Sequence, residues 1–180
     1  MKHYLLFAAG KDRPGIVAAI SRILYRHGCN MADSTMTRIA SEFAMLLIFQ
    51  APAGWRVERI GRELQRCEKR LGLFTGIKPL APSESRTLKP KGRAHIISVY
   101  GADRPGIVYR VSRCLASKRI NITHVSTHRT ETSRAAGYVM LLEVELPSLR
   151  MAAGLNKSLG RLAAGLGLHV SMRPVEIAKL

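Results

Sequence analysis

The chain has 180 residues and a mass of 19.9 kDa, enough for one large domain or two small ones. Its composition, 47% hydrophobic and 23% charged, excludes the disordered and low-complexity classes of protein. Lys and Arg total 29 against 12 acidic residues, for a formal net charge of +17. This excess is spread over both halves of the sequence, so it attracts polyanions without defining a basic tail or a docking surface.

Cysteine usage and hydropathy suggest a compartment. The apolar stretch near the N-terminus is short and is broken by Gly10, which argues against a signal peptide. No apolar run approaches the roughly 18 residues that a membrane helix requires. The cysteines Cys29, Cys67 and Cys114 are odd in number and far apart, which favours reduced thiols over a disulfide framework. We therefore expect a cytoplasmic protein without a membrane segment.

The sequence contains an internal repeat. Residues 10–24 align with residues 101–115 at an offset of 91, and ten of the fifteen positions are identical. From Met45 onward the match continues at an offset of 95, which places a four-residue insertion in the second copy near residues 130–137. A match kept over nearly the whole length indicates a duplicated domain. The predicted domains are 1–80 and 93–180, joined by a polar linker at 81–92.

Both copies predict the same elements in the same order. Each opens with a strand, and the Gly-x-Asp-Arg-Pro-Gly turn that follows places a proline, Pro14 in the first copy, at the first position of a helix. Apolar residues recur with helical spacing from Ile16 to Leu24 and again from Ile60 to Leu71. Strands are predicted at residues 3–9, 30–39, 43–51 and 73–80, with counterparts at 95–100, 121–130, 138–146 and 168–175.

The order βαββαβ in each copy predicts the fold class. It is α+β, with two ferredoxin-like units in tandem, each an antiparallel four-stranded sheet with two helices on one face. Such a unit leaves two sheet edges unpaired, and its core is small. We therefore expect the units to pair, either within one chain or in a homodimer.

The turn between the first strand and the first helix is the best-matched segment of the two copies. Its opening glycine lets a ligand approach the backbone. The first-turn amides of Gly15 and Ile16 lie at the positive end of a helix, an anion site suited to a carboxylate. Asp12 adds a negative group that can pair with an ammonium, so the turn has the features of a site for a free α-amino acid. The alternative interpretation is structural, because an aspartate before a helix often only caps it.

These motifs together resemble the ACT domain family. The resemblance rests on the strand, the turn Gly-x-Asp-Arg-Pro-Gly-Ile-Val, the helix and the asparagine that opens the next strand, and it covers nearly the whole chain as two ACT domains. ACT domains are small-molecule sensors, usually of amino acids, which bind between paired domains near this loop and the start of the second strand. The ligand contacts that the resemblance implies are Gly10, Asp12, Arg13, Pro14, Gly15 and Asn30, with Gly101, Asp103, Arg104, Pro105, Gly106 and Asn121 in the second copy.

The resemblance also implies a function. A pair of ACT domains with no third module implies a non-enzymatic, amino-acid-sensing regulator that needs no cofactor. It is expected to control a transcriptional regulator of glycine or one-carbon metabolism through protein–protein contact. The limited room beside the loop favours glycine or serine as the ligand. The alternative is a basic protein that binds DNA or RNA directly, although the sequence lacks a helix-turn-helix, zinc-finger spacing and a base-stacking aromatic pair.

Other patterns in the sequence carry less weight. His124 and His128 are about 13 Å apart on a predicted strand and have no counterparts in the first copy, so no metal site is expected. No Ser/His/Asp or Cys/His set recurs in both copies, so no catalytic residue is predicted. On the second helix, basic residues alternate with glutamates between Arg56 and Arg70, which predicts a solvated face with ion pairs four residues apart.

Overall fold

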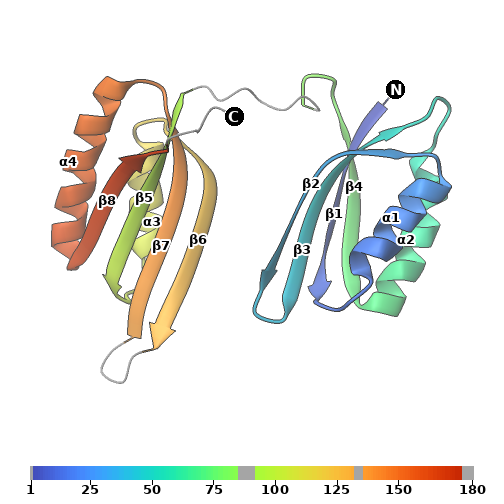
Figure 1. Cartoon of the computed structure of the whole chain (residues 1–180), viewed down its shortest axis with the longest axis horizontal. Helices are drawn as coiled ribbons and strands as arrows, with labels where there is room; N and C mark the ends of the chain where they lie inside the picture. Colours follow the sequence, from blue (N-terminus) through green and yellow to red (C-terminus); the bar gives the residue numbers. More distant parts are fainter. Residues whose placement is uncertain (1, 85–91, 132–135, 176–180) are drawn as a thin grey trace. The chain divides into compact units, whose positions relative to one another are not determined.

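The computed structural model describes residues 2–84, 92–131 and 136–175. The chain divides into two compact units, Met1–Leu88 and Lys89–Leu180 (Figure 1). Most of the expected linker at 81–92 lies outside the described residues. No helix in the described ranges combines the length and the apolar character needed to cross a membrane.

Each unit has the predicted order of elements. The first contains β1 (Lys2–Lys11), α1 (Ile16–Arg26), β2 (Asn30–Ile39), β3 (Glu42–Ala51), α2 (Val57–Leu71) and β4 (Leu73–Leu80). The second contains β5 (Arg93–Ala102), α3 (Ile107–Ala116), β6 (Asn121–Glu131), β7 (Ala136–Leu146), α4 (Leu149–Leu166) and β8 (Leu168–Pro174). The predicted α+β class with two βαββαβ units is confirmed.

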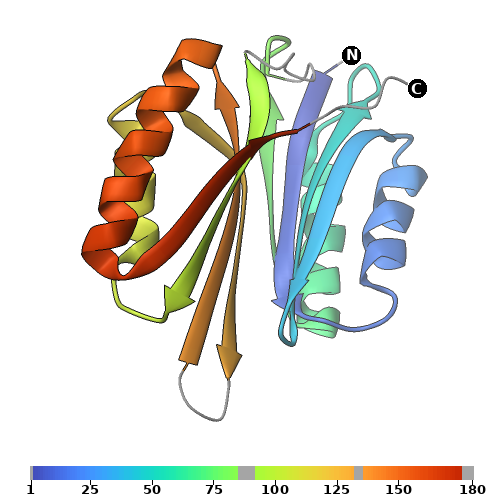
Figure 2. The same cartoon turned by 60° about the vertical axis from the view of Figure 1, so that its left-hand side comes forward.

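Each unit has one four-stranded sheet whose neighbouring strands are antiparallel. The order is β2-β3-β1-β4 in the first unit and β6-β7-β5-β8 in the second. Both helices of a unit lie on one face of its sheet, as the two views in Figures 1 and 2 show for α1 and α2. Because α1 carries the chain back along the sheet, β2 starts at the end where β1 starts and not at the end where β1 finishes.

The alternation of side chains along the central strands forms the core. In the first unit, Leu6 of β1 and Leu47 of β3 are fully buried against the helix side chains Ile20 and Ile60. Equivalent apolar residues fill the second unit, among them Ile97, Leu142 and Leu155. Two separate cores follow from one pattern that the sequence repeats.

The start of the first helix differs from the prediction. Pro14 was expected at the first helical position, but α1 begins at Ile16 and Gly15 is its N-cap, in the left-handed region at φ 95°. The second copy repeats this geometry, with Gly106 at φ 89° before α3. A residue at such a positive φ cannot continue a helix, so Pro14 belongs to the turn.

The insertion in the second copy lies in the hairpin between β6 and β7. Arg38 pairs with Phe43 in the first sheet, and Arg129 pairs with Tyr138 in the second, so the offset changes from 91 to 95 across this hairpin. The tip of the hairpin, at 132–135, lies outside the described residues. The register also shifts at matching places in the edge strands, between Met31 and Asp33 and between Ile122 and His124. These shared details indicate that the duplication extends to the irregularities of the sheet.

Candidate functional site

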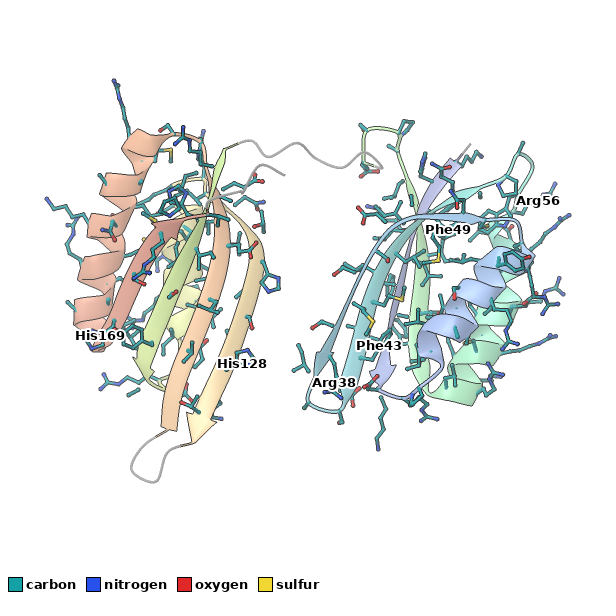
Figure 3. All side chains as sticks on the ribbon, in the orientation of Figure 1. Arg38, Phe43, Phe49, Arg56, His128 and His169 are labelled. Carbon is teal, nitrogen blue, oxygen red and sulfur yellow. The ribbon has the colours of Figure 1, made fainter. Side chains whose placement is uncertain are left out.

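The β1–α1 loop is tied to the neighbouring hairpin. β1 ends at Lys11, and the backbone N–H of Asp12 donates a hydrogen bond of 2.8 Å to the carbonyl of Ser41, between β2 and β3. Arg38 and Phe43 lie at this same end of the first unit (Figure 3). The loop, the start of α1 and the hairpin thus meet at one end of the sheet.

The first turn of α1 has no side-chain cap. Neither Gly15 before α1 nor Gly106 before α3 is accompanied by a capping hydrogen bond from a side chain. The interpretation of Asp12 and Asp103 as helix caps is therefore wrong. The first helical hydrogen bond runs from the N–H of Ala19 to the carbonyl of Gly15, so the amides without a helical partner include those of Gly15 and Ile16, as expected, and extend to Ala18.

Each aspartate of the turn instead faces an arginine of the adjacent strand. Asp12 Oδ2 lies 3.8 Å from Arg38 Nη1, and Asp103 Oδ2 lies 2.8 Å from Arg129 Nε. The two arginines occupy equivalent positions of the repeat, and both are largely exposed. They were not predicted as site residues, although their alignment in the repeat was a signal that pointed to them.

An open hollow of about 630 Å³ lies beside this loop in the first unit. Asp12 lies at its edge, and the chain from Arg13 to Ala18 forms one wall with Ser21. Met36 and the buried Phe43 come from the hairpin and form an apolar part of the lining. The hollow therefore brings together uncapped helix amides, a carboxylate and an apolar surface, which are the groups that an α-amino acid requires.

The two glycines that open the turns have a packing role. A Cβ at Gly10 would lie 2.5 Å from the carbonyl oxygen of Gly72, and a Cβ at Gly101 would lie 2.7 Å from Leu168 Cδ2. The space beside these glycines is filled by the junction between a helix and the strand that follows it. Both glycines are therefore in close contact with neighbouring chain, and their role in ligand approach stays a prediction.

The remaining loop residues lie at the surface. Arg13 and Pro14 are exposed and line the hollow. Their counterparts Arg104 and Pro105 are exposed as well. The structure thus groups Asp12, Arg13, Pro14 and Gly15 around one opening.

The asparagines lie far from the loops of their own units. Asn30 pairs with Gln50, which pairs with His3 near the start of β1. Arg38, at the loop end of the same strand, is eight residues further on, or about 26 Å at the usual rise. Asn121 has the same place at the start of β6. Within one unit, the structure does not bring the asparagine and the turn together.

The second copy has a more polar surface at the corresponding place. Tyr138 takes the position of Phe43, and Thr127 takes that of Met36. Burial raises the pKa of the Tyr138 phenol, and the negative charge of Asp103 raises it further, against an opposing hydrogen bond with Thr127. The two copies therefore share the turn but differ in the side chains around it.

In the ranges that the structure describes, no group of three or more His, Cys, Asp or Glu side chains is placed to hold a metal ion. His128 Nε2 lies 3.0 Å from the hydroxyl of Ser126, within the same strand. The groups that the loop offers to a ligand are amides, a carboxylate and apolar side chains.

Comparison with known proteins identifies similar sequences. Two family models match, both described as ACT domains, at residues 2–78 and 95–148. The chain is 26% identical over 182 residues to the glycine cleavage system transcriptional repressor of Escherichia coli K12. That match covers 99% of this chain and 93% of the repressor.

Two crystal structures share the fold over nearly the whole chain. A protein from Galdieria sulphuraria superimposes with a TM-score of 0.79 at 22% identity, covering 97% of this chain and 99% of the other. A putative glycine cleavage system transcriptional repressor superimposes with a TM-score of 0.69 at 21% identity, covering 98% of each chain. Both likenesses concern the fold of the tandem pair.

Proposed function

Because the chain belongs to the ACT-domain family, as two ACT domains in tandem, we propose that it is a non-enzymatic sensor of a small α-amino acid. It is a regulatory protein related to the glycine cleavage system transcriptional repressor. The further proposal is that it controls a transcriptional regulator of glycine or one-carbon metabolism by protein–protein contact. That step is supported by the relationship to the repressor, which spans both domains.

The observation that carries the sensing proposal is the hollow at the start of α1. The ligand carboxylate would accept hydrogen bonds from the uncapped amides of residues 16–18. Its ammonium would face Asp12, whose pairing with Arg38 at 3.8 Å is long and leaves the carboxylate about one-third exposed. The side chain of the ligand would contact Val17 and Met36.

The proposed identity of the amino acid rests on the related repressor and not on the size of the hollow. A hollow of about 630 Å³ is larger than glycine needs, so the argument from limited room does not select a ligand. Glycine and serine remain the proposed ligands because the related repressor is named for glycine cleavage.

The test is a calorimetric titration of the full chain with each of the twenty amino acids. Asp12→Asn removes the charge with little change of shape, so the affinity for the bound amino acid should fall by about 10- to 100-fold. Asp33→Asn is the matched control, since Asp33 is exposed on β2 and does not line the hollow. Equal affinities for the parent and Asp12→Asn would remove Asp12 from the site, and a parent that binds no amino acid would overturn the sensing proposal.

A second candidate is direct binding of DNA or RNA, which the net charge of +17 favours. The two candidates differ in how binding depends on salt, because contacts with nucleic-acid phosphates weaken steeply as salt rises.

A further inference from the structure

A groove of about 350 Å³ lies between the two helices of the first unit. Figure 2 shows α1 and α2 side by side on the same face of the sheet. Each helix contributes two arginines to the groove, Arg22 and Arg26 from α1 and Arg66 and Arg70 from α2. Residues four apart lie on the same face of a helix, separated by one turn. The two arginines of α1 therefore form one pair, which faces the pair from α2 across the groove.

The base of the groove is apolar. Ala19, Ile23 and Cys67 line it, and each is more than nine-tenths buried in the core of the first unit. The guanidinium groups therefore surround an apolar floor, with Glu63 as an acidic residue in the lining. Any anion that enters meets positive charge from two helices above an apolar floor.

The positive charge of the groove is largely uncompensated. Glu63 is its single acidic lining residue, and its carboxylate lies 3.7 Å from Arg26 and 3.0 Å from the ring of His27. In the part of the chain that the structure describes, Arg22, Arg66 and Arg70 have no carboxylate within 4 Å. Four guanidinium groups against one carboxylate leave three excess positive charges.

The next acidic residue of α2 is engaged elsewhere. Glu68 accepts hydrogen bonds of 2.8 Å from both the backbone N–H and the hydroxyl of Thr75, on β4. Among the described residues, no ion pair joins two side chains of α2, so the expected pairs four residues apart are not formed. Like charges one turn apart destabilise a helix. The arginine cluster is therefore not explained by a contribution to the stability of the fold.

Only half of the cluster has counterparts in the second copy. The positions that match the four arginines hold Arg113, Ser117, Arg161 and Gly165, and Ser158 takes the place of Glu63. The repeat preserves the turn but not the groove. The full set of four arginines therefore occurs in the first unit alone and is separate from the duplicated turn.

We propose that this groove binds the phosphate groups of a small oligophosphate ligand. A planar guanidinium fork donates two parallel hydrogen bonds to phosphate oxygens, and arginines on two sides can surround a chain of phosphates. The volume suits a small molecule. None of the lining residues is aromatic, so the groove recognises the phosphates and not a base stacked beside them.

The experiment is a calorimetric titration of the full chain with inorganic tripolyphosphate at fixed ionic strength. Saturable binding at one site is expected. The double variant Arg22→Gln/Arg70→Gln should weaken it by about 10- to 100-fold. Arg62→Gln/Lys69→Gln is the control, because it removes the same charge from α2 at exposed positions outside the groove and should change affinity by less than about twofold.

Two further measurements complete the test. Arg22→Lys/Arg70→Lys keeps the charge and loses the fork, so it should bind tripolyphosphate less tightly than the parent even if the glutamine variant fails to fold. Titrations with ATP and AMP show whether the phosphates alone are sufficient for binding. If they are, as we expect, ATP binds about as tightly as tripolyphosphate and AMP binds much more weakly. Equal losses in the groove and control variants, or random duplex DNA binding through these arginines without any binding of tripolyphosphate, would overturn the proposal.

Discussion

Arg129 Nε lies 2.8 Å from Asp103 Oδ2, and this pair joins the turn before α3 to the edge strand β6. The first copy repeats the contact at 3.8 Å between Arg38 and Asp12. Both arginines are largely exposed, so water screens the attraction. We therefore infer that the pair, which recurs in both copies, positions the carboxylate and adds little to the stability of the fold.

This pair should contribute little to folding. In a double-mutant cycle of Asp103→Asn and Arg129→Gln, the coupling in the free energy of unfolding should be below about 1 kcal/mol, as for other exposed ion pairs. Urea denaturation followed by circular dichroism measures it. A coupling of several kcal/mol would show that the pair is structural and that the aspartate is not free to serve a ligand.

Gly10→Ala should destabilise the first unit. The new Cβ would lie 2.5 Å from the Gly72 carbonyl oxygen, and backbone cannot move aside as a side-chain end does. We expect a loss of about 1–3 kcal/mol in the free energy of unfolding. Gly61→Ala is the control: it lies within α2 with nothing near its added Cβ, so it should raise stability by up to about 1 kcal/mol. A Gly10→Ala protein as stable as its parent would contradict the packing role.

Cys29 should alkylate slowly at neutral pH. Burial raises the pKa of its thiol, so less thiolate is present than in a free cysteine, and the thiolate is the reacting form. Iodoacetamide labelling followed by peptide mass mapping, with N-acetylcysteine amide as reference, gives the rate at each pH. The rate should rise later in pH than that of the reference, and a Cys29 that reacts as fast as the reference at pH 7 would refute the shift.

The raised pKa of Cys29 also fixes the sign of a stability change. The folded protein prefers the protonated thiol, so this contribution is fully present below the ordinary pKa of the thiol. It is lost as the pH rises through the pKa of the folded state. A Cys29→Ser protein should therefore lack the part of the decline in stability that the parent shows in this alkaline range.

Random duplex DNA should bind only weakly. A net charge of +17 attracts phosphates at low salt, but the excess is spread over both halves of the chain, and the arginine groove between α1 and α2 is small, at about 350 Å³. At an ionic strength of about 0.15 M, we expect a dissociation constant no tighter than about 10⁻⁶ M by fluorescence anisotropy. Tight binding at this salt, with a steep slope of log affinity against log salt, would favour the nucleic-acid candidate instead.

The order of elements was predictable because its signals are local and appear twice. The spacing of Ile16, Ile20 and Leu24 reports a helix wherever the rest of the chain lies. The start of that helix was missed because Gly15 takes a positive φ, which a proline one residue earlier does not reveal. The internal repeat therefore supported the prediction of which helices and strands form, but not the prediction of the residues at which they begin and end.

The site was predicted in part for the same reason. Asp12 and Arg38 are far apart in sequence, and their contact depends on how the hairpin packs beside the loop. The arginine groove depends on the packing of α1 against α2, which helix spacing alone does not give. Asn30 and the turn of its own unit lie at opposite ends of the sheet because of the helical crossover, and the role of Asn30 in ligand binding stays a prediction.

The separation of Asn30 from its own turn has a thermodynamic consequence. Any ligand that touches both a turn and an asparagine must bridge two ACT domains, so its binding and the association of those domains share one free energy. Occupancy would then depend on how often the domains meet, and the ligand would in turn lengthen each encounter. Where the two domains belong to separate chains, the protein would respond to an amino acid and to its own concentration as a single combined signal.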